Sequence, residues 1–170
     1  MTYGIALFPS NELQDEANSY RKRFDSHYAS IPPHITLTDS FELDEEALAS
    51  FLQSLEELAN TQPKVVIEVY KADSFIPLYH KIFLKIREHE TLTSLHERLH
   101  TAPFSSEMTH TFVPHITIAQ DLPKAENDDL MGQLKMRGFS HNEVISEFHL
   151  IEKKDDEKWV IVRTFELKGE

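Results

Sequence analysis

The sequence contains Pro-His-Ile-Thr twice, once in Ile31-Pro32-Pro33-His34-Ile35-Thr36-Leu37 and once in Phe112-Val113-Pro114-His115-Ile116-Thr117-Ile118. The two copies lie about half of the 170-residue chain apart. This spacing suggests two related halves. Each half would then contribute one histidine and one threonine to a shared site.

The alternation within each copy predicts which side chains face that site. Successive side chains of a strand point to opposite faces, so residues two apart share a face. His34 and Thr36 therefore share one face, and His115 and Thr117 share the equivalent face of the second copy. The apolar residues between them belong in the core. The alternative is two ordinary, half-exposed strands whose histidines form only local hydrogen bonds.

The histidines have the chemistry of an acid–base pair. An unperturbed imidazole has a pKa of about 6.5, so one copy can be neutral while the other is protonated. A neutral ring can take a proton from water, and a protonated ring can give one to a leaving oxygen, each worth roughly 10²- to 10⁴-fold in rate. Cleavage of a phosphodiester requires this pair on opposite sides of the phosphorus, and the threonine hydroxyls could donate to its oxygens.

Composition excludes several other classes. The chain has no cysteine, which removes disulfides and thiolate chemistry and agrees with a cytoplasmic location. A net charge of −12 argues against long duplex nucleic acid or a membrane surface as a partner. No apolar stretch approaches the ~18 residues of a membrane helix. The four glycines form no phosphate-binding loop.

Periodicity predicts a mixture of strands and helices in one domain. Apolar spacing, Ser10 and Asp44 as helix caps, and Pro103 as a stop predict helices over residues 10–23, 44–59, 91–101 and 125–135. Period-two patterns predict strands over residues 3–8, 34–37, 65–70, 81–86, 111–119, 144–151 and 159–167. This order is typical of an α+β fold with largely antiparallel sheets.

A second motif predicts a different chemistry. His96-Glu97-Arg98-Leu99-His100 matches His-Glu-x-x-His, the pattern of zinc proteases, and a helix would bring both histidines to one face. Zinc needs a third protein ligand; the sequence indicates none, although His110 and the many acidic residues are candidates. The simpler interpretation is a surface helix that carries two histidines.

Other residues could assist a phosphate or a base. The candidate cations are Lys81, Lys85 and Arg163, and the candidate stacking rings are Tyr3, Phe75, Tyr79 and Phe112. For each of them a place in the core or on a sheet surface is the simpler expectation.

The two His-x-Thr-x motifs, His34-Ile35-Thr36-Leu37 and His115-Ile116-Thr117-Ile118, resemble the signature of the two-histidine (2H) phosphoesterase superfamily, which includes the LigT-type RNA 2′,3′-cyclic phosphodiesterases. The chain as a whole resembles the small Bacillus-type branch known as YjcG-like phosphoesterases. The resemblance implies a bilobal α+β fold with two pseudo-symmetric lobes and a central cleft, in a single domain over residues 1–170. It also implies His34 as proton donor, His115 as proton acceptor, and Thr36 and Thr117 as substrate-binding residues.

The expected function is therefore metal-independent, cofactor-free hydrolysis of a phosphodiester, most simply a 2′,3′-cyclic phosphate of a nucleotide or RNA end. The acidic surface favours a small substrate over long RNA. Two alternatives remain: a nucleotide- or RNA-end-binding module without chemistry, and a zinc hydrolase that uses His96, Glu97 and His100.

Overall fold

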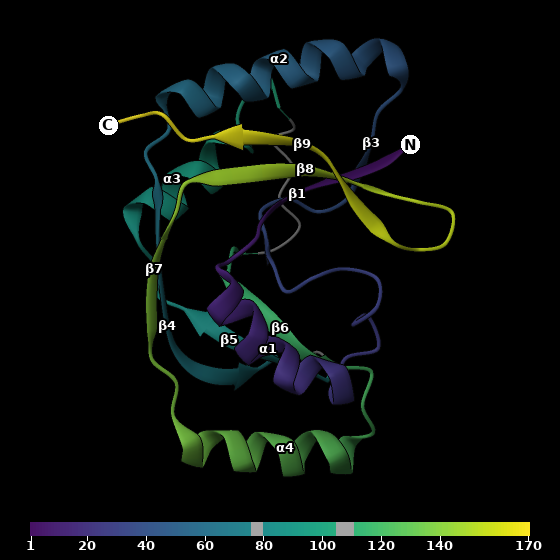
Figure 1. Cartoon of the computed structure of the whole chain (residues 1–170), viewed down its shortest axis with the longest axis vertical. Helices are drawn as coiled ribbons and strands as arrows, with labels where there is room; N and C mark the ends of the chain where they lie inside the picture. The colour runs from purple at the N-terminus through teal and green to yellow at the C-terminus, as the bar shows by residue number, and fades with distance from the viewer. Residues whose placement is uncertain (76–79, 105–110) are drawn as a thin grey trace.

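The computed structural model describes residues 1–75, 80–104 and 111–170 of the chain (Figure 1). Within these ranges it consists of four helices interspersed among nine strands. Their order is β1 (Thr2–Leu7), α1 (Asn11–Phe24), β2 (Ile35–Thr36), β3 (Phe41–Glu42), α2 (Glu45–Thr61), β4 (Val65–Ser74), β5 (Lys81–Ile86), α3 (Glu90–Arg98), β6 (His115–Gln120), α4 (Lys124–Arg137), β7 (His141–Ile145), β8 (Glu147–Lys153) and β9 (Trp159–Glu166).

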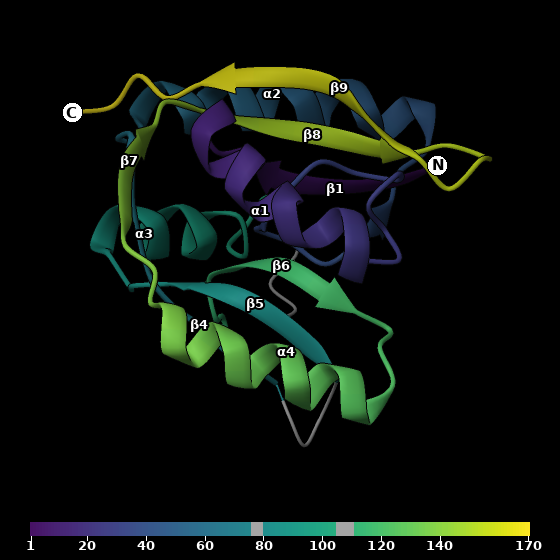
Figure 2. The same cartoon turned by 60° about the horizontal axis from the view of Figure 1, so that its bottom comes forward.

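The strands form two antiparallel sheets. In sheet A the order is β2-β1-β8-β9, with β3 also paired to β1, and in sheet B the order is β6-β5-β4-β7. Helix α2 packs on β9 of sheet A, while α3 and α4 pack on β4 of sheet B. Figure 2 shows the two sheets as separate layers, with α1 against β6. The α+β architecture predicted from the sequence is confirmed.

Both motif strands lie at the end of a sheet among the described strands. β2 is the last strand of sheet A, and β6 is the last strand of sheet B. The two strands nevertheless lie against each other. The sheet edges therefore bring the two Pro-His-Ile-Thr copies together, although no backbone ladder joins them.

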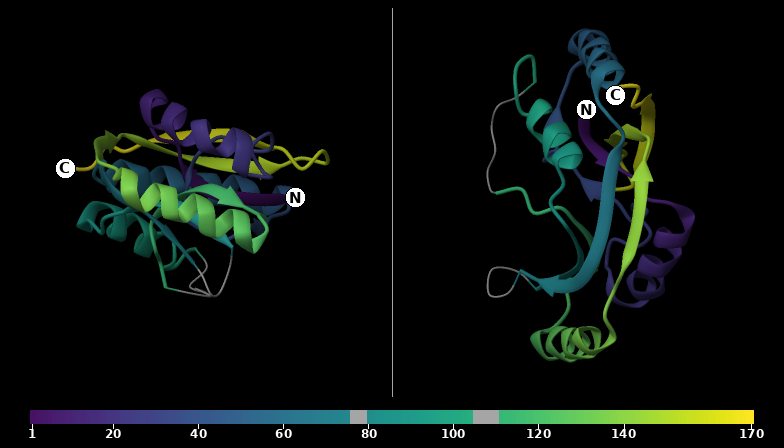
Figure 3. Two further views of the ribbon diagram at one scale, coloured as in Figure 1. Left: turned by 90° about the horizontal axis from the view of Figure 1, so that it is seen from below. Right: turned by 90° about the vertical axis from the view of Figure 1, so that its left-hand side faces the viewer.

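The halves of the sequence do not coincide with the sheets. Sheet A takes its strands from both ends of the chain, whereas sheet B is built from the middle. The prediction of one strand over residues 144–151 is wrong for this reason. The segment contains two strands: β7 pairs with β4 in sheet B, and β8 pairs with β1 in sheet A. Figure 3 shows β4 and β7 side by side, and Ser146, at the break, accepts a backbone hydrogen bond from Leu167.

The helix starts follow the predicted caps. The Ser10 hydroxyl accepts from the backbone N–H of Leu13, and the Asp44 carboxylate accepts from that of Ala47. Helix α3 ends earlier than predicted. Its last turn tightens as the N–H of His100 donates to the Glu97 carbonyl, which also accepts from the Thr101 hydroxyl.

The core joins the two sheets in one apolar cluster. The apolar residues of both motif strands are buried in it, as the alternation predicts: Ile35, Leu37, Ile116 and Ile118. Their burial turns the alternate side chains of the motifs away from the core. Among the described residues, no helix is both long and apolar enough to cross a membrane.

Candidate active site

His34 is held by the backbone just before β2. Its Nδ1 lies 2.9 Å from the carbonyl oxygen of Pro32. A carbonyl only accepts, so Nδ1 carries the hydrogen and donates it. In the neutral ring Nε2 is then the nitrogen with a lone pair. The backbone thus fixes which nitrogen can take a proton.

His115, the first residue of β6, repeats this arrangement. Its Nδ1 lies 2.6 Å from the carbonyl oxygen of Val113, again two residues earlier. The rings of Phe83 and Phe75 flank the imidazole, with centroids 5.0 Å and 5.2 Å away. In both copies the accepting carbonyl precedes a proline, so the shared tripeptide geometry orients the two histidines alike.

The environment of His34 favours its neutral form. Removal of the ring from water lowers the pKa of His34 from 6.5 to about 4. The positive charge of Arg21 and the nearby His115 act in the same direction, while the hydrogen bond to Pro32 and the carboxylate of Asp25 oppose it. The residue as a whole is half-buried, so protein atoms crowd the ring while one part still meets solvent.

Two hollows open beside these histidines. The His34 hollow, of about 270 Å³, is lined by His34, and the His115 hollow, of about 250 Å³, is lined by His115. Three residues line both: Thr36, Thr38 and Asp39. The segment of residues 36–39 therefore separates two adjoining parts of one cleft.

The two motif threonines differ in position. Thr36 is exposed and lines both hollows. Thr117 is half-buried on β6, opposite Phe83 of β5, and lines neither hollow. The structure thus brings His34, His115 and Thr36 to the cleft, while a substrate-binding role for Thr117 stays a prediction.

Of the residues suggested as helpers, Lys81, Phe75 and Phe112 line the His115 hollow. Nζ of Lys85 instead lies 3.9 Å from Oδ2 of Asp73, and the guanidinium of Arg163 packs over the ring of Phe165. Of the other candidate stacking rings, Tyr3 is buried in the core, and Tyr79 lies outside the described residues.

The sequence analysis missed two cleft residues, Thr38 and Asp39. Thr38 continues the alternation of His34 and Thr36, so the same period of two could have identified it. Its hydroxyl accepts from the backbone N–H of Ile5 at 3.2 Å, which ties the segment to β1. Asp39 follows the strand in a connection, where no periodicity predicts its direction.

The His96-Glu97-x-x-His100 motif also borders the cleft. His96 and His100 line the His115 hollow; their ring centroids are 4.2 Å apart, and Nδ1 of His100 donates to the His96 carbonyl. The ring of His96 stacks on Phe112, with centroids 3.8 Å apart. Among the described residues, no group of three or more His, Cys, Asp or Glu is arranged to hold a metal ion. His110, the suggested third zinc ligand, lies outside the described residues.

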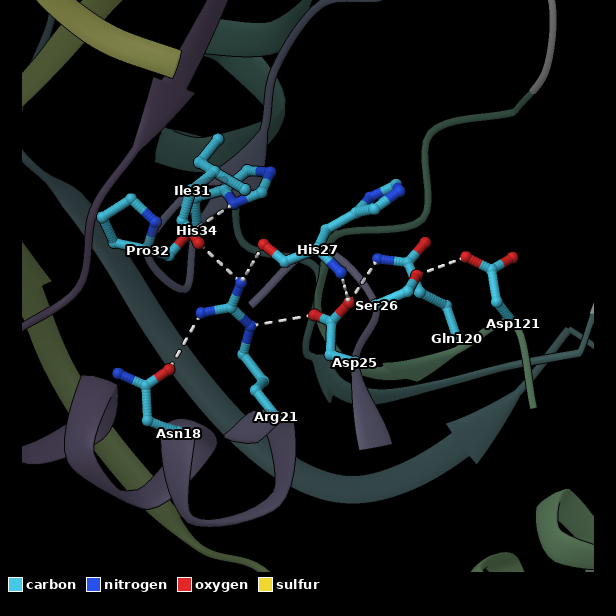
Figure 4. A network of polar contacts seen from close by, with 10 residues as sticks. All are labelled: Asn18, Arg21, Asp25, Ser26, His27, Ile31, Pro32, His34, Gln120 and Asp121. Carbon is cyan, nitrogen blue, oxygen red and sulfur yellow. Dashed lines mark hydrogen bonds and ion pairs between the residues drawn. The ribbon is translucent and has the colours of Figure 1, made fainter. Parts of the chain in front are cut away.

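A buried ion pair connects the segments that carry the two motifs (Figure 4). Arg21 lies in α1 and Asp25 directly follows it, and both side chains are buried. Nε of Arg21 lies 2.9 Å from Oδ2 of Asp25. Arg21 also donates to the carbonyl of Ile31, just before the Pro32 that holds His34. Asp25 accepts from the side chain of Gln120, the last residue of β6. One pair thus contacts the approach to the first motif and the end of the second motif strand.

The fold and the cleft together define a class: a two-sheet α+β protein with one His-x-Thr motif from each sheet edge. Comparison with known proteins agrees. The family model described as "2'-5' RNA ligase superfamily" matches residues 9–157. A protein of Halalkalibacterium halodurans named "Putative phosphoesterase" is 46% identical over 100% of this chain and 99% of its own length. One of the same name from Oceanobacillus iheyensis is 43% identical over 98% of each chain.

Solved structures show the same fold. A protein of Thermus thermophilus aligns over 100% of both chains with a TM-score of 0.74 and 20% identity. LigT of E. coli, in a complex with 3′-AMP, aligns over 97% of both chains with a TM-score of 0.69 and 18% identity. The chain therefore belongs to the 2′-5′ RNA ligase superfamily, the two-histidine phosphoesterases that its motifs resemble.

Proposed function

We propose that this protein is a phosphoesterase that hydrolyses a phosphodiester, the 2′,3′-cyclic phosphate of a nucleotide or an RNA end. One observation carries the proposal. Two histidines on facing sheet edges each donate Nδ1–H to the carbonyl two residues earlier, which leaves Nε2 of each for proton transfer at one cleft. The relatives named as phosphoesterases support the same class of reaction.

The proton balance of the reaction assigns a role to each ring. One neutral histidine takes a proton from water as its oxygen attacks phosphorus, and one protonated histidine gives a proton to the ribose oxygen as the P–O bond breaks. Because the pKa of His34 lies near 4, His34 is the neutral partner in the ligand-free protein. We therefore assign acceptance to His34 and donation to His115, the reverse of the order implied by the family resemblance.

The cleft supplies charge stabilisation from its own side chains. Lys81 and the hydroxyls of Thr36, Thr38 and Thr111 line the His115 hollow. A cation and hydroxyl dipoles around developing phosphate charge can act without a metal ion. This cationic spot lies in a chain of net charge −12, which favours a small substrate over a long polyanion. LigT of E. coli has been solved with 3′-AMP, ATP and NADP+, all small nucleotides.

The test is turnover of 2′,3′-cyclic nucleotides and short RNAs that end in a cyclic phosphate, in excess chelator. We expect His34→Ala and His115→Ala each to lower kcat by about 10²-fold or more. The matched control is His141→Ala, because His141 lies on β7 at the opposite end of sheet B from β6. We expect it to keep wild-type turnover.

Each alternative gives a distinct result. Nucleotide binding without turnover in either the hydrolytic or the ligating direction would identify a binding module. Activity abolished by chelator, and lost in His96→Ala and His100→Ala, would identify a zinc hydrolase. Either outcome would overturn the proposal.

A further inference from the structure

A third hollow, of about 480 Å³, lies between α2, β3 and the end of α3. We call it the aromatic hollow, because Phe41, Phe51 and Phe104 line it. Their rings contact one another in a row: Phe41 and Phe51 have centroids 5.2 Å apart, and Phe51 and Phe104 have centroids 5.5 Å apart. All three are only partly buried, so the row leaves apolar ring surface facing the hollow. Its volume lies within the range of small-molecule sites, roughly 300–1,000 Å³.

The aromatic hollow adjoins the candidate active site. Thr38, Asp39 and His100 line both the aromatic hollow and the His115 hollow. The His115 hollow in turn contains His115, Thr36 and Lys81. A ligand with a phosphate beside His115 could therefore extend past Thr38 and place its remaining part among the phenylalanines.

The charges around the two hollows differ and define what each can hold. Among the described residues that line the aromatic hollow, none is lysine or arginine, and two are the carboxylates Asp39 and Glu42. Asp39 borders both hollows, so the difference lies in Glu42, which lines only the aromatic hollow, and Lys81, which lines only the His115 hollow. A second phosphate in the aromatic hollow would meet like charge without a cation, whereas Lys81 favours an anion in the His115 hollow. The part of the ligand that enters the aromatic hollow is therefore uncharged, apolar on its faces and able to donate hydrogen bonds at its edge.

We propose that the aromatic hollow binds the nucleobase of the substrate whose phosphate lies between the two histidines, an inference that rests on the proposed function. A base has π faces that can pack against the phenylalanine rings. Adenine, guanine and cytosine also carry an amino group that can donate a hydrogen bond to a carboxylate. The protein then acts on a mononucleotide or on the last nucleotide of an RNA, and most of its ground-state affinity comes from the base.

Two variants test this. Leu43→Trp places a large ring in the aromatic hollow from a half-buried position that lines neither hollow of the cleft, and Phe104→Ala removes one of the walls of the aromatic hollow. We expect each to lower kcat/KM for adenosine 2′,3′-cyclic phosphate by about 10-fold or more. Neither should change kcat/KM for glycerol 1,2-cyclic phosphate, which has the same reacting group without a base. Phe24→Ala is the matched control, since this half-buried phenylalanine lines none of the three hollows.

Equal losses on the two substrates, or no loss on either, would overturn the inference and leave the proposed function standing. A separate binding measurement tests the inference even if the proposed hydrolysis does not occur. Calorimetry with 3′-AMP and with inorganic phosphate should show weaker 3′-AMP binding in Leu43→Trp and unchanged phosphate binding, even if no substrate turns over. If Leu43→Trp instead converts a dimer into a monomer and leaves 3′-AMP binding intact, the hollow is a contact between two copies, and the inference is wrong.

Discussion

His34 shows how one residue's surroundings determine its role. Its ring is crowded by protein, fixed by the Pro32 carbonyl at Nδ1, and within the electrostatic reach of Arg21 and His115. The crowding, Arg21 and His115 outweigh the Pro32 hydrogen bond, which favours the charged ring, and they keep the side chain neutral at pH values where a free histidine is half protonated. A group that stays neutral is ready to accept a proton but is a poor donor.

This protonation state predicts the acid side of the pH profile. We expect kcat/KM, which reports on the free enzyme, to fall on the acid side only as His34 protonates near pH 4. Arg21→Met removes a charge that lowers the pKa of His34, so the fall should begin at higher pH. NMR titration of the His34 ring would follow the same change directly. A wild-type acid limb near pH 6.5 would contradict the assignment.

Much of the site could be predicted residue by residue because its motifs lie on strands. A period of two placed His34 and Thr36 on a common face, and it extends to Thr38. The sequence offers three strand cations and does not distinguish them: Lys85 is paired opposite His115 in the sheet, whereas Lys81, opposite Gln120, is the one that lines the His115 hollow. Asp39 could not be predicted, since a connection between strands has no repeating side-chain direction.

At the scale of elements, α1 connects the two segments that carry the motifs. The buried Arg21–Asp25 pair at its end contacts both the segment before His34 and the end of β6. A buried ion pair contributes little net stability over an apolar pair, but removal of one partner leaves the other charge uncompensated. The pair therefore acts mainly on the relative placement of the two motif segments.

We expect Arg21→Met to lower the free energy of unfolding by about 3–5 kcal/mol, because Asp25 is left buried and unpaired. The double variant Arg21→Met/Asp25→Leu should recover a large part of that loss. Urea denaturation measures both. The exposed pair of Lys124 and Asp128, also one helical turn apart, is the control, and Lys124→Ala should cost only about 0.5 kcal/mol. A double variant less stable than the single one would contradict this account.

Local signals predicted the elements better than their partners. Ser10 and Asp44 marked helix starts because a cap acts within one turn of chain. The break at Ser146 was missed because residues on both sides suit a strand, and only distant partners assign β7 and β8 to different sheets. Strand pairing between remote segments leaves little trace in the local sequence.

At the scale of the whole molecule, buried histidines make stability depend on pH. Burial lowers the pKa of both His34 and His149, so between pH 6.5 and the lowered values the unfolded chain binds more protons than the folded protein. The free energy of unfolding therefore falls as the pH is lowered through this window.

We expect His34 alone to account for about 2 kcal/mol of the change between about pH 7.5 and pH 5. Denaturation curves of wild type and His34→Gln at both pH values would measure it. The variant should lose less stability on acidification than the wild type. Equal losses would show that His34 is as easily protonated in the fold as in the open chain.

The interleaved strand order has a consequence for synthesis on the ribosome. The central strand β8 of sheet A is made after every strand of sheet B, and it pairs with β1, which is made first. A growing chain can thus assemble the layer that carries His115 while the layer that carries His34 still lacks its middle strand. The complete cleft would then form only after β8 has been synthesised and has paired with β1.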